Sequence, residues 1–168
     1  MNVIIEGNLK FSFPHDWSVS KYDEWSFYRN QFQKVCTGVK AIDILALGVA
    51  RSAWFIEVKD YRVHPRTKVI DLAEEVAEKV RDTLAALLPA SVNANDTNEK
   101  RFAHTTLSSR SLRVVLHLEQ PRKHSKLFPR AIDPAKILQR LKQLLKAVDA
   151  HPKVLESGRM GNVAWTVN

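Results

Sequence analysis

The sequence predicts an α/β fold in which a mixed central β-sheet of about five strands is flanked by helices. Short runs rich in Val, Ile and Phe are typical of strands, and they alternate with longer segments in which Leu and Val recur at helical spacing. The chain has 168 residues, which suits one domain with a core of ordinary size. No repeat or shift in composition divides it, so we expect a single domain over residues 1–168.

The N-terminal part is expected to supply edge strands and the first helix. Alternating apolar residues around a Gly-Asn pair indicate a small hairpin or two edge strands over residues 1–13. Ser20, followed three residues later by Asp23, is typical of a helix start and predicts a helix over about 21–32. A strand over about 33–39 should follow it and precede the central hairpin.

The central element is a β-hairpin predicted over residues 40–62. If its turn is centred on Ala50, the numbers of cross-strand partners sum to 100, and Asp43 falls opposite Glu57. Side chains alternate between the faces of a strand, so Lys59 shares the face of these two carboxylates. Like charges placed directly opposite each other are destabilising, and a divalent cation between the two carboxylates would compensate.

The clearest helix is predicted over residues 71–88, where Asp71 is the expected N-cap and Glu74 occupies the capping-box position. We expect its acidic residues Glu74, Glu75 and Glu78 to form a solvated face. The elements expected after it are a flexible polar loop (91–98), a short helix (99–109), a strand that joins the sheet in parallel (112–119), a helix (133–148) and a last edge strand (162–167).

The positive charge is concentrated in one segment. The net charge is +8, and residues 110–146 alone contain ten Lys or Arg side chains against two acidic ones. Such an excess favours a polyanionic partner, and we expect nucleic acid, with DNA as the first choice. The candidate backbone contacts are Arg122, Lys123, Lys126, Arg130, Lys136 and Arg140.

Several classes of protein are disfavoured by composition. No apolar run reaches the length that a membrane span requires, and the N-terminus does not resemble a secretory signal. The single Cys36, which we expect to be buried, allows neither a disulfide framework nor a thiol metal site. We therefore expect a cytoplasmic protein without a membrane partner.

One pattern on the hairpin resembles a known signature. The pattern consists of Asp43, thirteen further residues and then Glu57-Val58-Lys59. It resembles the D…(D/E)xK motif of the PD-(D/E)xK nuclease superfamily, which includes many restriction endonucleases. The proline that often precedes the first acid in that family is replaced here by Ile42. The resemblance implies a restriction-endonuclease-like core with the motif on a hairpin.

The same resemblance implies roles for individual residues. Asp43 and Glu57 would bind Mg²⁺ or Mn²⁺, with the Val58 carbonyl as a candidate third ligand, and Lys59 would position or activate the attacking water. Members of that family often carry a further acid on the first helix. Glu24 is the candidate for this position, although Asp23 and Glu24 are also residues that a helix start favours, and we prefer that explanation.

The leading functional expectation is a metal-dependent nuclease, a hydrolase of phosphodiester bonds in DNA. The alternatives are a catalytically inactive, nuclease-like module that binds nucleic acid or protein, and a structural subunit whose basic segment contacts an acidic partner. The form of the substrate, endo or exo action, sequence specificity and oligomeric state, including a homodimer, are left open.

Overall fold

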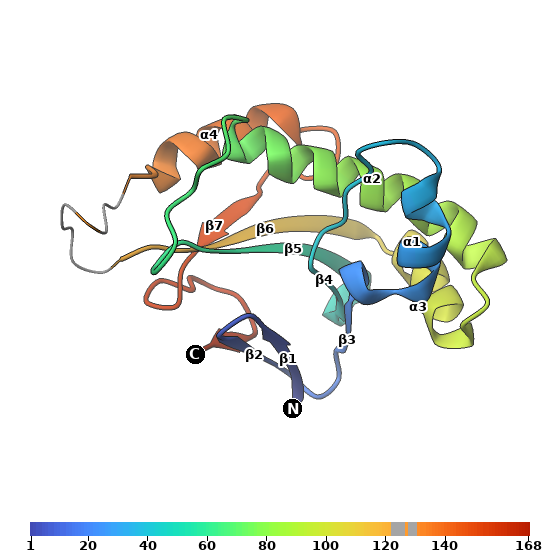
Figure 1. Ribbon diagram of the computed structural model, residues 1–168. Coiled ribbons are helices and arrows are strands. Elements are labelled where there is room, and N and C mark those ends of the chain that lie inside the picture. Colours follow the sequence, from blue (N-terminus) through green and yellow to red (C-terminus); the bar gives the residue numbers. More distant parts are fainter. Residues whose placement is uncertain (122–126, 128–130) are drawn as a thin grey trace.

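The computed structural model describes residues 1–121, 127 and 131–168. Its main body is a mixed five-stranded sheet with the order β3-β4-β5-β6-β7, and a second, three-stranded sheet has the order β1-β2-β8 (Figure 1). The predicted α/β class, with a five-stranded mixed sheet flanked by helices, is confirmed. The strands are β1 (Asn2–Glu6), β2 (Leu9–Phe13), β3 (Ser18–Lys21), β4 (Ile44–Gly48), β5 (Ser52–Asp60), β6 (Ser111–Glu119), β7 (Lys153–Leu155) and β8 (Thr166–Val167). The helices are η1 (Tyr22–Glu24), α1 (Ser26–Asn30), η2 (Phe32–Lys34), η3 (Val49–Arg51), α2 (Leu72–Asn93), α3 (Thr97–Leu107) and α4 (Pro134–Leu144).

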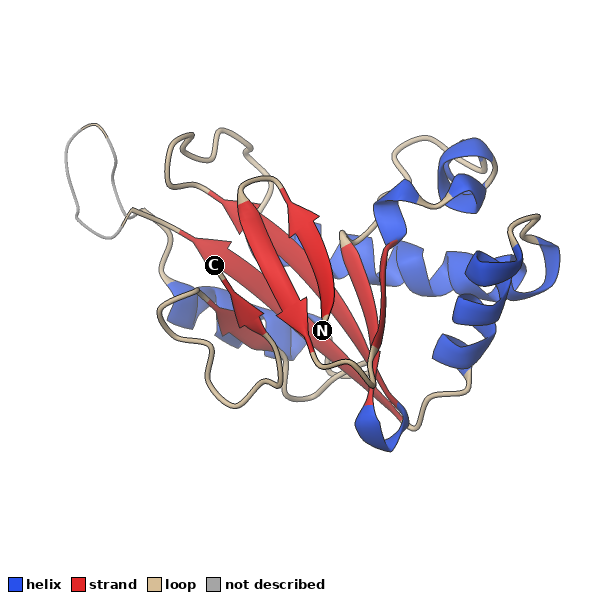
Figure 2. Ribbon diagram, turned by 90° about the horizontal axis from the view of Figure 1, so that it is seen from below, coloured by secondary structure: helices blue, strands red, loops and turns tan. Residues whose placement is uncertain are grey.

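The two faces of the large sheet are covered differently. Helices α2 and α4 lie on one face, and the small sheet lies on the other, as the views in Figures 1 and 2 agree. A large apolar cluster, which includes Phe55, Val76 and Leu141, fills the helix side. A second cluster, which includes Phe11, Ile56 and Trp165, lies between the two sheets. The central strands are therefore buried on both faces.

The central hairpin has the predicted register. Ile44 pairs with Ile56 and Leu45 with Phe55, so partner numbers sum to 100. The next pair outward along the hairpin would be Asp43 and Glu57, which places the two carboxylates at the same level of the sheet. The alternation of apolar residues on both strands sets this register because a shift of one residue would expose the whole apolar set.

The parallel part of the sheet is confirmed and is larger than expected. Strand β6 pairs with β5 in parallel over nine residue pairs, after a crossover through α2 and α3. The short strand β7, which was not predicted, adds to β6 in parallel at the far edge. The last strand, expected over 162–167, is limited to β8 and lies at an edge as predicted, in the small sheet, where Thr166 pairs with Ser12.

Helix α2 is longer than the sequence suggested. Asp71 is its N-cap and accepts hydrogen bonds from the Ala73 and Glu74 amides at 2.9 and 3.2 Å. The helix continues past Pro89 to Asn93, and α3 begins at Thr97, so the expected loop over 91–98 is wrong except at residues 94–96. Buried residues on both sides of the proline keep the helix packed and outweigh the single hydrogen bond that proline removes.

The predictions for residues 21–39 are partly wrong. The expected first helix is broken into η1, α1 and η2, because Trp25 has an extended backbone between the first two. The strand expected over 33–39 is absent, and Cys36 is exposed rather than buried. The third antiparallel strand is β3, whose pairing with β4 runs from Ser18–Leu47 to Lys21–Ile44. An edge strand is selected mainly by backbone hydrogen bonds, so its residue types are a weak guide.

Within the described residues, no helix combines the length and apolar character that crossing a bilayer would require.

Candidate functional site

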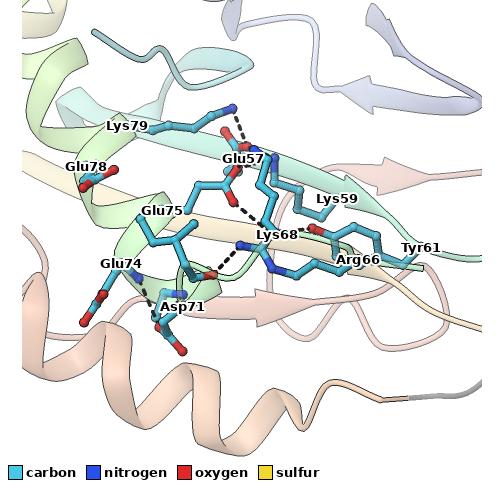
Figure 3. A network of polar contacts seen from close by, with 12 residues as sticks. Glu57, Lys59, Tyr61, Arg66, Lys68, Asp71, Glu74, Glu75, Glu78 and Lys79 are labelled. Atoms are coloured by element: carbon cyan, nitrogen blue, oxygen red, sulfur yellow. Dashed lines mark hydrogen bonds and ion pairs between the residues drawn. The ribbon is translucent and has the colours of Figure 1, made fainter. Parts of the chain in front are cut away.

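The hairpin and α2 together hold a cluster of charged side chains on the helix side of the sheet (Figure 3). We use the name charged cluster for Asp43, Glu57, Lys59, Glu75 and Lys79, with Arg66 and Lys68 at its edge. Every member has at least one partner of opposite charge within the cluster.

The two hairpin carboxylates are the most deeply placed members. Glu57 is fully buried in the middle of β5, and Asp43, just before β4, is 9% exposed. Asp43 Oδ2 accepts a hydrogen bond from the Val58 amide at 2.7 Å, which crosses the hairpin and holds that carboxylate in place. No described residue donates a hydrogen bond to Glu57 Oε2, although this atom is buried.

Two ammonium groups compensate the paired carboxylates. Lys79 Nζ, reaching down from α2, lies 2.5 Å from Glu57 Oε1 and 3.4 Å from Asp43 Oδ1, so it bridges them. Lys59 Nζ lies 2.8 Å from the same Glu57 oxygen and 3.2 Å from Glu75 Oε1. The repulsion between Asp43 and Glu57 is therefore relieved by cations of the chain itself.

Glu75 connects the cluster to the segment between β5 and α2. Its buried carboxylate meets Lys59, Arg66 at 2.8 Å and Lys68 at 2.7 Å. Arg66 also donates to the Tyr61 hydroxyl at 3.0 Å and to the Ile70 carbonyl at 2.7 Å. The prediction that Glu75 belongs to a solvated face is wrong, because this side chain points into the cluster from the buried side of α2.

Two buried acids of the charged cluster, Glu57 and Glu75, differ strongly in pKa. Burial, reinforced by the Asp43 charge, raises the pKa of Glu57 to about 7. Burial also opposes the charged form of Glu75, but Lys68, Arg66 and Lys59 outweigh it and lower the pKa of Glu75 to about 2. Glu57 can consequently exchange a proton near neutral pH, whereas Glu75 stays ionised.

The two lysines remain cationic. Burial alone would lower the pKa of Lys59, but the Glu57 charge and hydrogen bond, with Glu75, raise it above its ordinary value. The pKa of Lys79 is raised in the same way, chiefly by Glu57 and Asp43 acting against burial. Chemically, the site is a proton-exchanging carboxyl group held between two fixed ammonium groups.

Glu24, the candidate acid on the first helix, lies apart from this group of contacts. Its carboxylate is half-exposed and pairs with Lys21 at 2.9 Å. Its neighbour Asp23 is electrostatically coupled to the cluster instead, because burial and then the Asp43 charge raise the pKa of Asp23 to about 6. The sequence offered no means of choosing between two adjacent acids, whose orientation depends on how η1 packs.

The candidate nucleic-acid contacts fall into two groups. Lys136 and Arg140 are exposed on α4, where Arg140 pairs with Glu74 of α2 at 2.9 Å. The other four, Arg122, Lys123, Lys126 and Arg130, lie outside the described residues.

Sequence reasoning missed Lys79, Glu75, Arg66 and Lys68 as members of the cluster. A signal for two of them was present, since Glu75 and Lys79 are four residues apart, next to the buried Val76 and Val80 on α2. No comparable signal marks Arg66 or Lys68, which reach the cluster from an irregular segment.

Comparison with known proteins gives one informative relative. The chain is 34% identical over 170 residues to the cysteine–tRNA ligase of Neisseria meningitidis serogroup A. The similarity covers 83% of this chain and 24% of the ligase, so the chain spans about a quarter of the length of this curated relative. No family model matches the chain, and no solved structure matches it.

This relative overturns the assignment made from the D…ExK pattern. Membership of the PD-(D/E)xK superfamily is wrong, and with it a nuclease or other hydrolase acting on DNA and the inactive nuclease-like alternative, because the relative is a tRNA ligase. The structure supplies a physical explanation for the pattern. Asp43, Glu57 and Lys59 are joined by Lys79 into an ion-paired group that links the hairpin to α2.

Binding of Mg²⁺ or Mn²⁺ stays a prediction that these contacts do not favour. The described residues contain no group of three or more acidic, His or Cys side chains arranged to hold a metal ion. Lys79 also lies between the two carboxylates on which the prediction rested. The donor set therefore does not fit a hard cation that prefers six oxygen ligands.

The assignment of residues 1–168 to a single domain stays a prediction, and the oligomeric state, including a homodimer, stays open.

Proposed function

We propose that this chain is a tRNA-binding unit of a protein related to cysteine–tRNA ligases. The support is its similarity to part of the N. meningitidis enzyme, whose name states that it acts on tRNA. Because the chain corresponds to about a quarter of that enzyme, the proposal assigns it contact with tRNA and leaves the joining of cysteine to tRNA to the larger enzyme.

The observation that carries the proposal is the row of cations on α4 and just beyond it. Lys136, Lys142 and Lys146 are exposed, and in the described part of the chain no carboxylate pairs with them. The opposite, apolar side of the helix, with Ile137 and Leu141, is buried against the core and fixes which side faces outward. Unpaired ammonium groups on a rigid helix can neutralise phosphates and release their counterions.

Backbone contacts of this kind suit an accessory unit. They position an RNA helix without reading its sequence, and they leave recognition of a particular tRNA to other parts of the larger protein. Arg140 is expected to contribute less, since Glu74 already neutralises it.

The proposal is tested by measuring the affinity of the purified chain for an unmodified tRNA transcript by fluorescence anisotropy at several salt concentrations. The double variant Lys142→Glu/Lys146→Glu should bind at least about tenfold more weakly and show a shallower salt dependence, because phosphate contacts have been lost. The matched control is Lys10→Glu/Lys34→Glu, which changes two exposed lysines elsewhere by the same charge. Equal losses in the two double variants, or no binding of tRNA by the unaltered chain, would refute the proposal.

A further inference from the structure

Helix α3 lies at the end of α2 remote from α4 (Figure 1), and a groove runs along it. The groove consists of three adjoining hollows of about 450, 520 and 400 Å³. The first two share Asn98 and Phe102, and the second and third share Leu47 and Thr105. We call this feature the α3 groove. Its lining includes α3 residues from Asn98 to His104 and Thr105, so it follows a helix that is roughly 16 Å long.

The floor of the groove depends on close packing of an aromatic ring against strand β4. Trp17 lines the middle hollow, and a Cβ atom added to Gly48 would come within 2.6 Å of its ring. Glycine at this position allows the indole to lie against the backbone. The groove is consequently a shaped feature of the fold rather than a gap between mobile side chains.

One half of the groove is cationic. Arg101 lines the middle hollow and Arg51 the third, and neither is paired with a carboxylate in the described part of the chain. At the other end, Glu24 is neutralised by Lys21 at 2.9 Å. The remaining carboxylate, Glu99, accepts hydrogen bonds from the Ser26 and Phe27 amides at 2.7 and 3.0 Å. The acids of the groove are thus occupied, whereas its two arginines can meet an anion.

The backbone holds Arg51 in an unusual conformation. Ala50 and Arg51 both have a φ of 56°, in the left-handed region that residues other than glycine rarely adopt. The turn is tied to the segment that follows α3: the Arg110 amide donates to the Arg51 carbonyl at 2.8 Å, and the Arg51 guanidinium donates to the Ser108 carbonyl. Strained backbone that the surrounding contacts hold in place is common at binding sites.

The middle of the groove offers contacts that a nucleobase could use. Phe102 is only partly buried and lines two of the hollows, and its ring is supported edge-on by Trp25 at a centroid distance of 5.8 Å. Asn98 stands one turn before it and lines the same hollows; its amide oxygen accepts a hydrogen bond from the Arg101 guanidinium at 2.9 Å, which leaves the amide NH₂ group for a base. An aromatic ring beside unpaired arginines is the combination with which proteins hold single-stranded nucleic acid.

From these features we infer that the α3 groove binds a short unpaired segment of RNA, with phosphates at Arg51 and Arg101 and a base against Phe102. The choice of RNA rests on the function proposed above, but the groove is separate from the α4 surface and extends that function to a second contact. An acidic peptide fits the groove less well, because its acidic side chains would leave the Phe102 ring without a flat group to stack on it.

The inference is tested with a fluorescein-labelled octauridylate, which is unstructured, and with a blunt RNA duplex of eight base pairs. Both RNAs are compared in the Lys142→Glu/Lys146→Glu background, which removes the phosphate contacts proposed for α4. This background should bind the single strand more tightly than the duplex. Arg51→Gly/Arg101→Ala should weaken this binding by about tenfold, and glycine is chosen because it tolerates the left-handed backbone. Phe102→Leu should weaken it about fivefold, since the side chain stays apolar but the stacking face is lost.

The matched control is Lys10→Ala/Lys34→Ala, which also removes two exposed cations but lies outside both the groove and the α4 surface. It should leave octauridylate binding unchanged. Full octauridylate affinity in Arg51→Gly/Arg101→Ala, equal affinity of the Lys142→Glu/Lys146→Glu background for the duplex, or displacement of the oligonucleotide by octaglutamate at equal concentration would each overturn the inference. Circular dichroism of every variant checks that the fold is intact.

The two proposals fail in different ways. If the chain binds tRNA through α4 but the groove variants do not change its affinity for octauridylate, the proposed function stands and the inference about the groove is refuted. If the chain binds octauridylate in the groove but does not bind tRNA, the inference about the groove stands and the proposed function is refuted.

Discussion

The charged cluster and the α3 groove both contain cations, but they hold them in opposite states. In the cluster, Lys59 and Lys79 are mostly buried and each contacts two carboxylates. In the groove, Arg51 and Arg101 are exposed, and the described residues pair neither with an acid. The lysines of the cluster stabilise the fold through their ion pairs, whereas the arginines of the groove remain available to a ligand.

This difference explains why charge counted along the sequence is a poor guide to where a ligand binds. In the segment 40–80, which carries the most suggestive motif, every Lys and Arg except Arg51 is paired with a carboxylate. The binding features proposed here lie on α3, on α4 and at the turn that contains Arg51, where the cations face outward. Four predictions test whether this contrast is correct, and they follow from the largest expected effect to the smallest.

Removing the bridging ammonium should have the largest effect on stability. Lys79→Met keeps the length of the side chain but leaves Glu57 and Asp43 without their shared cation, and the free energy of unfolding should fall by about 3 kcal/mol. Lys40→Met is the control, because the Lys40–Glu78 pair is about one-third exposed and should contribute less than about 1 kcal/mol. Urea denaturation measures both. Similar losses in the two variants would show that the buried ion pairs of the cluster contribute no more to stability than the partly exposed Lys40–Glu78 pair.

The stability of the protein should depend on pH through Glu57. Its pKa in the folded chain, about 7, lies above the ordinary value of 4.5. Between these values the folded state binds more protons than the unfolded chain, so the stability contributed by Glu57 is present at low pH and is lost as pH rises through about 7.

Glu57→Gln removes this dependence. Relative to this variant, the unaltered chain should lose on the order of 2 kcal/mol of unfolding free energy as the pH rises from 5 to 8. Denaturation series at several pH values measure it. Working above pH 5 avoids the titration of Glu75, whose pKa is lowered to about 2. A difference independent of pH would contradict the placement of Glu57.

The floor of the α3 groove should contribute to stability through close packing. Gly48→Ala places a methyl group against the Trp17 ring, and we expect a loss of about 1 to 2 kcal/mol in unfolding free energy. Gly158→Ala is the control, since nothing lies within 4 Å of the added methyl group and its backbone is not left-handed. Chemical denaturation compares the two variants, and a neutral Gly48→Ala would mean that the groove floor can rearrange.

The smallest effect concerns the strained turn beside the groove. Ala50→Gly should stabilise the protein by about 0.5 to 1 kcal/mol, because glycine adopts a φ of 56° without steric cost. The same substitution at Ala85, exposed in the middle of α2, should instead destabilise it by about 1 kcal/mol. Thermal unfolding of both variants provides the measurement. If both substitutions are destabilising, Ala50 is not strained.

Much of the core of the fold could be predicted from the chain itself. The register of β4 with β5 followed from a two-residue alternation, and the start of α2 at Asp71 followed from its capping pattern. Strand β6 was recognised by its aliphatic run, and its parallel pairing followed from the crossover before it. These features are local, or depend on one short connection, so the residues that define them are close in sequence.

The errors arose where a distant segment decided the outcome. Residues 33–39 have the composition of a strand but lie outside the sheet, because β3 occupies the edge of β4. The pattern of Asp43, Glu57 and Lys59 was read correctly as a group of neighbours, but its meaning was not. Lys79, which reaches the carboxylates from α2, lies 22 residues beyond Glu57 in the sequence, and no spacing rule within the hairpin anticipates that contact.

The sequence by itself determined the α/β class, the hairpin register and the positive charge of the chain, because alternation, capping residues and composition act over short distances. Only the tertiary structure decided which charges are neutralised and which are free. That choice depends on side chains brought together by the packing of α2 and α3 against the sheet, and electrostatic free energy depends on distance in space and on burial, not on separation along the chain.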